Sequence, residues 1–375
     1  MNLPSSNSKT TSAAATPAAK PHYSRGYWGD VWQRYRRKFF PMVALTYVVF
    51  MFIVGISAPF IVGTKPIVCR YKGKTYFPCL GYWNDRWEDA KLKKEFSREK
   101  DRYSAITRKD KEGWVVWPLV YQDPLRRLRN NEFEGIPENP LGKEGRPNKF
   151  NWFGTNLQGV DSFAHIVHGT QTALLVGFFS TGISAIIGLI IGALSGYLGG
   201  VVDNALSRLT EIFMCLPTLV MILGIIAVVE QPTIWHTMFV LGVTGWTSIA
   251  RLTRGEFLKL REMEYVSAAR ALGVSRFRIM LRHILPNALA PVLVPISFGI
   301  ASAILTENAL SYLGLGSGPK MASWGNLLSA GKQSPENWWL ILFPGLAIFL
   351  TVLAYNLIGE GLQEATDPRL REGTK

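Results

Sequence analysis

The sequence predicts an all-α integral membrane protein with six transmembrane helices and an extracytoplasmic insert between the first and the second helix. Three observations predict this class. Long apolar runs alternate with charged segments in a chain of 375 residues that is 48% hydrophobic and 18% charged. The basic residues gather beside the apolar runs, as membrane topology requires. One long segment, 63–165, has the mixed composition of a small soluble domain.

Six apolar runs are each close to the length that crosses a bilayer. At a rise of about 1.5 Å per residue, about 20 residues span a hydrocarbon core of about 30 Å. The first run is read as a retained anchor, because a cleavable signal peptide would begin nearer the N-terminus. The predicted spans are 39–62, 170–198, 212–229, 234–250, 288–306 and 338–358.

Charge predicts the orientation of these spans. Arg34, Arg36, Arg37 and Lys38 precede the first span, so the N-terminus is expected in the cytoplasm. Alternation then places the insert outside, and the loop 251–287 and the C-terminus inside. The composition of the loop 251–287 independently supports its cytoplasmic placement, because it contains eight Arg and Lys residues. The basic insert does not contradict this, since long loops are translocated largely regardless of charge. The expected location is the plasma (inner) membrane, with several passes.

The segments flanking the spans have simple expected roles. Residues 1–38 are expected to form a disordered cytoplasmic tail, of which residues 1–20 are rich in Ser, Thr, Ala and Pro, and 363–375 a second cytoplasmic tail. The insert is expected to be a small ordered cap, with a charged helix over 91–112. Its core is expected to use aromatic side chains. These are Tyr76, Tyr82, Trp83, Trp87, Trp114 and Trp117.

Several kinds of chemistry are excluded. The net charge of +14 does not indicate nucleic-acid binding, because the basic residues flank membrane spans. The sequence contains neither a phosphate-binding Gly-x-x-x-x-Gly-Lys-[Ser/Thr] loop nor a paired-Cys or His-Glu-x-x-His metal motif, so no catalytic or metal site is predicted. Glu211, Glu230 and Glu307 are placed at span ends, which counts against an ion-coupled carrier.

Cys69 and Cys79 lie outside, either bonded or as two free thiols.

Glycines recur along the second span. Small residues let transmembrane helices approach closely. They indicate either ordinary packing within the chain or a helix that lines a moving interface. These glycines are Gly177, Gly182, Gly188, Gly192 and Gly196.

The loop 251–287 is charged and amphipathic and carries small residues at helical spacing. Ala269 and Gly273 are four residues apart and share one helical face, where a partner could come close. Gly273 suits a helix C-terminus, a second helix is expected over 274–285, and Pro286 is expected to end it and start the next span. The loop is either a docking element or an amphipathic hairpin that rests on lipid.

At these residues the chain resembles the inner-membrane permeases of ABC importers of the dipeptide/oligopeptide/nickel class. The family pattern is Glu-Ala-Ala, three residues, Gly, nine residues, Ile, one residue, Leu-Pro. The chain has Ser267 at the glutamate position and His283 at the isoleucine position. The remaining positions match, and they are Ala268, Ala269, Gly273, Leu285 and Pro286.

Further matches extend the resemblance over residues 150–370. The insert looks like that of the subgroup linked with oligopeptide and microcin C-type uptake, at 73–78 and 113–118. Val160 stands where the family usually has Arg. The matching blocks are Phe153-Gly-Thr155 with Gly159 and Asp161, Gly196–Gly200 with Asp203, Arg208 and Pro217, Glu307 with Leu310–Gly316 and Trp324-Gly325, Gly359–Leu362, and Asp367-Pro-Arg369.

The resemblance implies a type I ABC importer transmembrane fold with a permease domain over 166–362. It implies a membrane pathway for peptides delivered by an extracytoplasmic solute-binding protein, formed as a heterodimer with a second permease. Two cytoplasmic ATP-binding subunits would hydrolyse ATP with Mg, and this chain would hold no cofactor. The docking residues that it implies are Glu264, Ala268, Ala269, Gly273, His283, Leu285 and Pro286.

Ala269 and Gly273 are expected at the contact with a groove of the ATPase. Three other functions stay open. The chain could be a permease for nickel or for modified peptides, a stand-alone secondary transporter, or a non-transporting scaffold.

Overall fold

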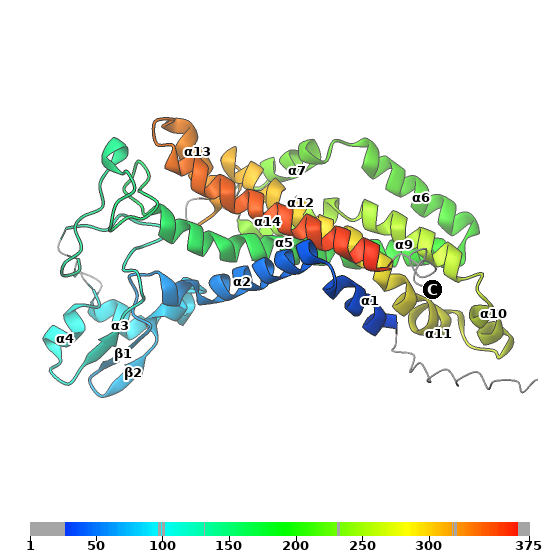
Figure 1. The fold of residues 1–375 in the computed structure, drawn as a ribbon, viewed down its shortest axis with the longest axis horizontal. Helices are drawn as coiled ribbons and strands as arrows, with labels where there is room; N and C mark the ends of the chain where they lie inside the picture. The colour runs from blue at the N-terminus through cyan, green and yellow to red at the C-terminus, as the bar shows by residue number, and fades with distance from the viewer. Residues whose placement is uncertain are drawn as a thin grey trace, which may run out of the picture.

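The computed structural model describes residues 27–366, apart from 97–98, 100–101, 131, 231–232, 317 and 319–320. The sequence to residue 26 and the C-terminal block at 367–369 lie outside the described residues. Figure 1 shows an elongated helical bundle with the insert at one end and the helices α10 and α11 at the other.

Long apolar helices form the bundle. Four of the described helices are long and apolar enough to cross a membrane, or up to five if a bent pair is counted as one. The central helix, α5, packs against α2, α8, α9 and α12. The four are α2 (Phe39–Ile61), α5 (Ser162–Leu198), α12 (Leu285–Tyr312) with the turns before it, and α14 (Trp339–Thr366).

The predicted third and fourth spans are wrong as single helices. The third is divided into α6 (Gly200–Cys215) and α7 (Thr218–Ala227), bent by 83°. Pro217 causes the break, because a proline disfavours the helical conformation of the residue before it, and Leu216 is extended. The fourth is divided into α8 (Ile234–Thr244) and α9 (Thr247–Leu260). The six-helix count is therefore not reproduced among the described residues.

The N-terminal segment is helical before the membrane. The prediction of a disordered tail up to residue 38 is wrong for its last part, because α1 (Tyr27–Arg36) precedes α2. Val31 and Tyr35 of α1 are buried against Ala365 of α14. The Tyr35 hydroxyl donates a hydrogen bond to the carbonyl of Pro41 at 3.0 Å. These contacts tie α1 to α14 and to the start of α2.

The glycines of α5 mark close helix packing. A Cβ on Gly177 would lie 2.9 Å from a methyl of Ile300 in α12. On Gly192 and Gly196 it would lie within 2.6 Å of backbone oxygens of α9. Side chains would therefore push α9 and α12 away from α5. This supports the packing interpretation, except at Gly182, where no atom lies within 4 Å.

The insert contains a small sheet, so the all-α prediction is wrong there. β1 pairs antiparallel with both β2 and β3. The prediction of one charged helix over 91–112 is also wrong, because two short helices, α3 and α4, lie there instead. The elements are β1 (Val68–Tyr71), β2 (Lys74–Tyr76), η1 (Pro78–Tyr82), η2 (Asp85–Trp87), α3 (Ala90–Glu95), α4 (Ala105–Lys109), β3 (Trp114–Val116) and η3 (Gly142–Glu144). Outside the insert, the helix α13 (Trp324–Gln333) precedes α14.

The core of the insert uses only part of the expected aromatic set, and Tyr82 packs against His168 of α5 instead. Trp83, Trp87 and Trp114 are exposed. Tyr76 and Trp117 pack against the core only partly buried. Strand β1 and the segments around α3 and α4 supply the buried side chains. The buried members are Cys69, Tyr71, Leu92, Phe96, Tyr103, Ala105 and Ile106.

The two cysteines of the insert are separate thiols in this structure, so the disulfide alternative is not the one adopted. Both are buried and free. The Cys79 thiol donates a hydrogen bond to the carbonyl of Ile67 at 3.2 Å. Burial raises the pKa of the Cys69 thiol to about 12, which keeps it protonated and unreactive.

A buried carboxylate holds the insert together. The Glu88 side chain, only 3% exposed, accepts hydrogen bonds from Tyr103 and, at 3.1 Å, from Lys65. Lys93 and Arg102 lie 3.7 and 3.8 Å away. Burial by itself would raise the pKa of Glu88, but the hydrogen bonds and cations outweigh it and lower the pKa below its ordinary value. Glu88 is therefore charged in the folded insert.

The stability of the insert is expected to fall in acid because of Glu88. A carboxyl whose folded pKa is lowered stabilises the protein above its unfolded pKa of about 4.3, and that stability is lost as the pH falls through the folded pKa. Thermal unfolding of the purified protein between pH 3 and 6 measures this. Glu88→Gln should be less stable at pH 6 and should show a flatter pH dependence. An unchanged pH dependence in that variant would show that Glu88 contributes nothing.

Candidate functional site

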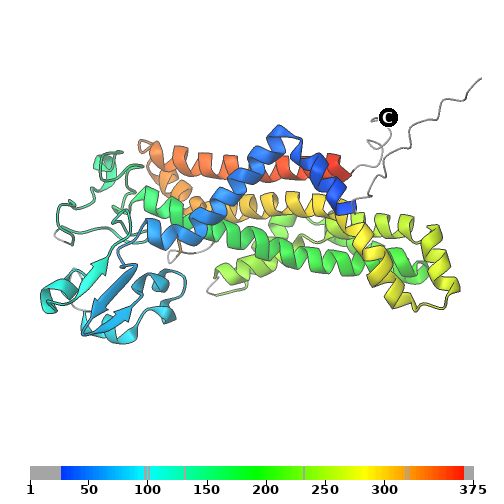
Figure 2. The same ribbon diagram turned by 60° about the horizontal axis from the view of Figure 1, so that its bottom comes forward.

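The candidate site is the helical projection at the end of the bundle opposite to the insert (Figure 2). α9 ends at Leu260, and α10 (Glu264–Ala271) follows after a short turn. The chain then enters α11 (Arg276–Ile279) and a π-helical turn, η4 (Met280–Ile284), which continues into α12. The second predicted helix, over 274–285, is thus confirmed in its main part.

The inner face of α10 packs on the bundle. Val266 and Ala269 are buried together with Phe257 of α9, Ile279 of α11 and Ile284 of η4. Ala269 therefore points into the protein. The expectation that Ala269 contacts an ATPase groove is wrong in this structure, because the small side chain lets α10 approach its own neighbours instead.

The outer face of α10 is open. Glu264, Ala268 and Leu272 follow one another at four-residue spacing, and all three are exposed. Leu272 is 83% exposed, and Phe277 on α11 is 66% exposed. Both are apolar side chains exposed on the surface of the projection. We call Glu264, Ala268, Leu272 and Phe277 the outer docking face.

Gly273 ends α10 in a left-handed conformation, as the sequence predicted. Its φ is +74°, its N–H donates to the carbonyl of Arg270 at 3.0 Å, and the N–H of Val274 donates to the carbonyl of Ala269 at 3.1 Å. These two bonds form a Schellman motif, in which Val274 packs back on the buried cluster. A Cβ on Gly273 would meet no atom within 4 Å. Gly273 is required for its backbone, and it lies at the surface.

Gly273→Val is expected to loosen α10, whereas Gly273→Asn should not. A β-branched residue at positive φ costs about 1–2 kcal/mol, and asparagine tolerates this conformation. Hydrogen–deuterium exchange of the α10 amides should be about tenfold faster in the valine variant, as a loss of this size implies. Equal exchange in both variants would contradict the assigned helix end.

Pro286 does not end the second helix, which is a correction. Residues 276–312 run as one helical segment, with Pro286 in the first turn of α12. Proline removes a backbone donor and crowds the carbonyl four residues earlier, and the π-helical turn before it widens the helix there. Pro286 is exposed, while His283 and Leu285 are half-buried. The side chain of Asn287 donates to the carbonyl of His283 at 2.7 Å.

A network that the sequence reasoning did not assign fixes α9 to α6 and α5. Arg254 donates to both carboxylate oxygens of Asp203, at 2.6 and 2.7 Å. Ser195 of α5 hydrogen-bonds the same carboxylate. The paired geometry makes this a strong ion pair. Asp203 belongs to one of the blocks that match the family. No local sequence pattern pairs it with Arg254, because the two residues are 51 positions apart.

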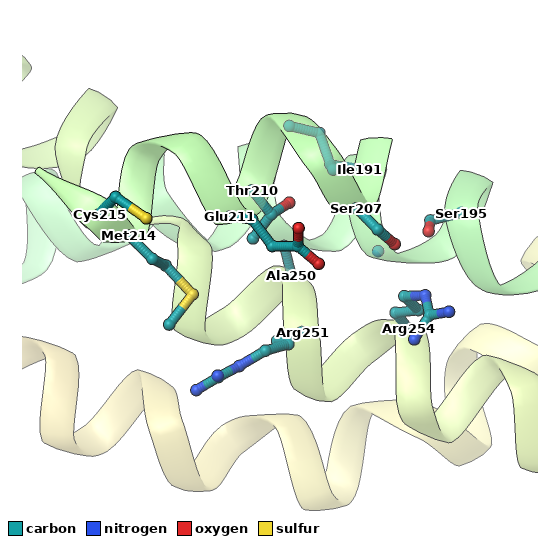
Figure 3. Close-up of a pocket in the computed structure, with 11 residues that line it drawn as sticks. Ile191, Ser195, Ser207, Thr210, Glu211, Met214, Cys215, Ala250, Arg251 and Arg254 are labelled. Atoms are coloured by element: carbon teal, nitrogen blue, oxygen red, sulfur yellow. The ribbon is translucent and has the colours of Figure 1, made fainter. Parts of the chain in front are cut away.

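A cavity of about 360 Å³ lies beside this network, between α5, α6 and α9. Figure 3 shows Ser195 and Ser207 near Arg254, while Arg251 extends away in the other direction. The projection is connected to the same region. Arg261 donates to the carbonyl of Gly196 at 3.1 Å, and the guanidinium of Arg270 lies 5.9 Å from the ring centre of Tyr197. α10 and the turn before it are therefore in contact with the end of α5.

Glu307 lies in the last part of α12, which ends at Tyr312. It is buried, and it accepts hydrogen bonds from Ser311 at 2.6 Å and from Ser323 at 3.1 Å. Ser323 precedes α13, so this carboxylate joins α13 to α12. The contacts are those of a structural group held by hydroxyls.

The fold and the projection together define a polytopic membrane protein with a helical projection at one end. The family model described as "Binding-protein-dependent transport system inner membrane component" matches residues 188–372. A second model, "N-terminal TM domain of oligopeptide transport permease C", matches residues 26–72.

Relatives of known name align over most of the chain. YejE, an inner membrane ABC transporter permease protein of Escherichia coli K12, is 33% identical over 352 residues, covering 92% of this chain and 94% of the relative. The oligopeptide permease OppC of Bacillus subtilis is 35% identical over 261 residues, covering 69% and 85%. The dipeptide permease DppC of Alkalihalophilus pseudofirmus is 37% identical over 234 residues, covering 62% and 77%.

A solved structure of the MetNI methionine ABC transporter in an inward-facing conformation aligns with a TM-score of 0.42 at 18% identity, covering 53% of this chain and 96% of that one. Among the sequence relatives, YejE aligns over nearly its whole length. The chain belongs to the family of binding-protein-dependent transport system inner membrane components, the ABC importer permeases. The resemblance on the loop residues is therefore confirmed at the level of the family.

Proposed function

We propose that this chain is a permease subunit of an ATP-driven importer of peptides. With a second permease it would form, as a heterodimer, the membrane pathway for peptides that an extracytoplasmic solute-binding protein delivers. The relatives named as dipeptide and oligopeptide permeases support the substrate class. The exposed outer docking face, carried on a helix whose inner face is packed into the bundle, is the observation that carries the proposal.

In this proposal a cytoplasmic ATPase subunit binds to the outer docking face. ATP and Mg would bind to two such partners, so this chain is not an enzyme. Closure of the ATPase pair would move α10, and the contacts of α10 with α9 and the unbroken segment from α11 into α12 would transmit the movement. The bundle would then change between discrete inward- and outward-facing packings.

The proposed orientation places the projection in the cytoplasm and the insert outside. The basic residues before α2 and along 251–287 support it. The protein would lie in the plasma (inner) membrane, with both chain ends in the cytoplasm. The pairs α6–α7 and α8–α9 would supply the third and fourth crossings as broken helices, which completes six.

Uptake by the reconstituted transporter tests the function. Proteoliposomes would contain this chain, the second permease and both ATPase subunits, with the solute-binding protein and labelled trialanine outside and ATP inside. Uptake is expected to require ATP and to persist when an ionophore abolishes the ion gradients. Uptake that continues without the ATPase subunits and stops with the ionophore would overturn the proposal in favour of a secondary transporter.

A further inference from the structure

A cavity of about 360 Å³ lies inside the bundle, between α5, α7, α8, α9 and α12. Its size is in the range of small-molecule sites, roughly 300–1,000 Å³. None of the described residues that line it is charged. Apolar side chains such as Ile222, Leu241 and Phe298 form part of its wall. Half of the lining consists of hydroxyl residues, which are Ser180, Thr181, Ser184, Thr218, Thr244, Ser248, Ser302 and Thr306.

Two of the buried hydroxyls have no hydrogen-bond partner among the described residues. Ser180 and Thr181, halfway along α5, are 1% and 3% exposed, and both hydroxyl oxygens are unpaired. Serine and threonine in a buried helix usually donate to the carbonyl one turn earlier. Ser297 and Thr306 of α12 do so, at 3.0 and 2.8 Å. Ser180 and Thr181 instead leave their hydrogen-bonding capacity for the cavity, at a cost in stability.

The cavity also has an open side. Thr218, Ser248 and Ser302 are exposed, whereas Ser180 and Thr181 lie at the buried side. A ligand could therefore enter from the surface of the subunit and reach the unpaired hydroxyls. In a dimeric permease, such an opening would face either lipid or the second subunit.

We propose that this cavity is a transient binding site for the backbone of the transported peptide, with Ser180 and Thr181 hydrogen-bonded to its amide groups. The proposal rests on the proposed function and goes beyond it by naming the contact. A hydroxyl both donates and accepts, so it matches the N–H and the C=O of a peptide unit. Because none of the described lining residues is charged, the cavity offers no ion pair that would select for acidic or for basic peptide side chains. The site would thus recognise what all peptides share.

The test uses the reconstituted transporter with the double variant Ser180→Ala, Thr181→Val, and Ser297→Ala as the matched control. Each lost hydrogen bond should lower the maximal uptake rate by about threefold to tenfold. The half-saturating concentration of loaded binding protein and the association with the ATPase should stay unchanged, because both are determined outside the cavity. The loss should be the same for trialanine, Ala-Lys-Ala and Ala-Glu-Ala. The control should transport normally.

A wild-type rate in the double variant would overturn the peptide-backbone site and leave the proposed function intact. A loss that depends on the charge of the peptide would also overturn it. If the unmodified transporter shows no ATP-driven uptake of any of the three peptides, the proposed function itself fails, and this site fails with it.

A labelling measurement keeps the proposal testable if the double variant does not fold. Ser180→Cys in a Cys215→Ser background leaves Cys69 and Cys79 as the other thiols, and both lie buried in the insert and do not line the cavity. During turnover with trialanine-loaded binding protein and ATP, reaction of the new thiol with a water-soluble methanethiosulfonate should slow at least threefold relative to turnover without peptide. An equal rate under both conditions would overturn the site.

Discussion

Arginine in place of Ala268 is expected to abolish binding of the ATPase subunit while the permease still folds and inserts. Ala268 lies exposed in the middle of the outer docking face, between Glu264 and Leu272. A long side chain there would prevent the close approach of a partner surface. A loss of about 2 kcal/mol or more is typical for a residue at the centre of an interface, which is at least about 30-fold in affinity.

Co-purification of the ATPase subunits with the permease in detergent measures this effect. Arginine is nearly as good a helix former as alanine, so α10 itself should persist. Ala268→Ser is the matched control, because it keeps the side chain small and should retain binding. ATPase binding by Ala268→Arg at the level of the unmodified protein would show that the outer docking face is assigned to the wrong side of α10.

Leucine in place of Gly192 is expected to destabilise the bundle by about 3 kcal/mol or more, at or above the upper end of what overpacking usually costs. A Cβ on Gly192 would lie 2.5 Å from the carbonyl oxygen of Ala250 and 2.6 Å from the Cβ of Thr253. The first of these atoms belongs to the backbone of α9, so a rotamer change cannot make room. The helices α5 and α9 would have to separate, which would also strain the ion pair between Asp203 and Arg254.

Thermal unfolding of the purified protein in detergent measures the effect on stability. Gly182→Leu is the matched control, because Gly182 lies on the same helix, is exposed, and has no atom within 4 Å of the place that a Cβ would take. It should change stability by about 0.5 kcal/mol or less, as surface substitutions usually do. Similar unfolding temperatures for the two variants would show that α5 and α9 do not pack as closely as the structure indicates.

Hydrophobicity and charge predicted the long helices because both act over many residues. The predicted first and last spans begin within one residue of α2 and α14. The same averaging hid the breaks in the middle of the chain. Pro217 was visible in the sequence, but the apolar run around it is long enough to pass as one span. The 83° bend depends on how α6 and α7 pack on their neighbours.

The candidate site shows the same division. Spacing correctly placed a helix before Gly273 and its left-handed end. It could not tell which face of that helix turns inward, because Ala268 and Ala269 are equally small. Phe257, Ile279 and Ile284 decide this, since together they form the buried surface on which Ala269 packs. The unpaired hydroxyls of α5 likewise have no local signature, because serine and threonine in a helix usually bond within it.

By itself, the sequence determined that this protein crosses a membrane, how its charged segments are distributed, and which family it resembles. These follow from properties that each residue carries with it, such as hydrophobicity, charge and the conformational freedom of glycine. Only the tertiary structure decided which face of α10 is exposed, that the insert contains a sheet, and where the unpaired hydroxyls meet. Those features depend on contacts between segments far apart in the chain, and such contacts leave no mark in either segment alone.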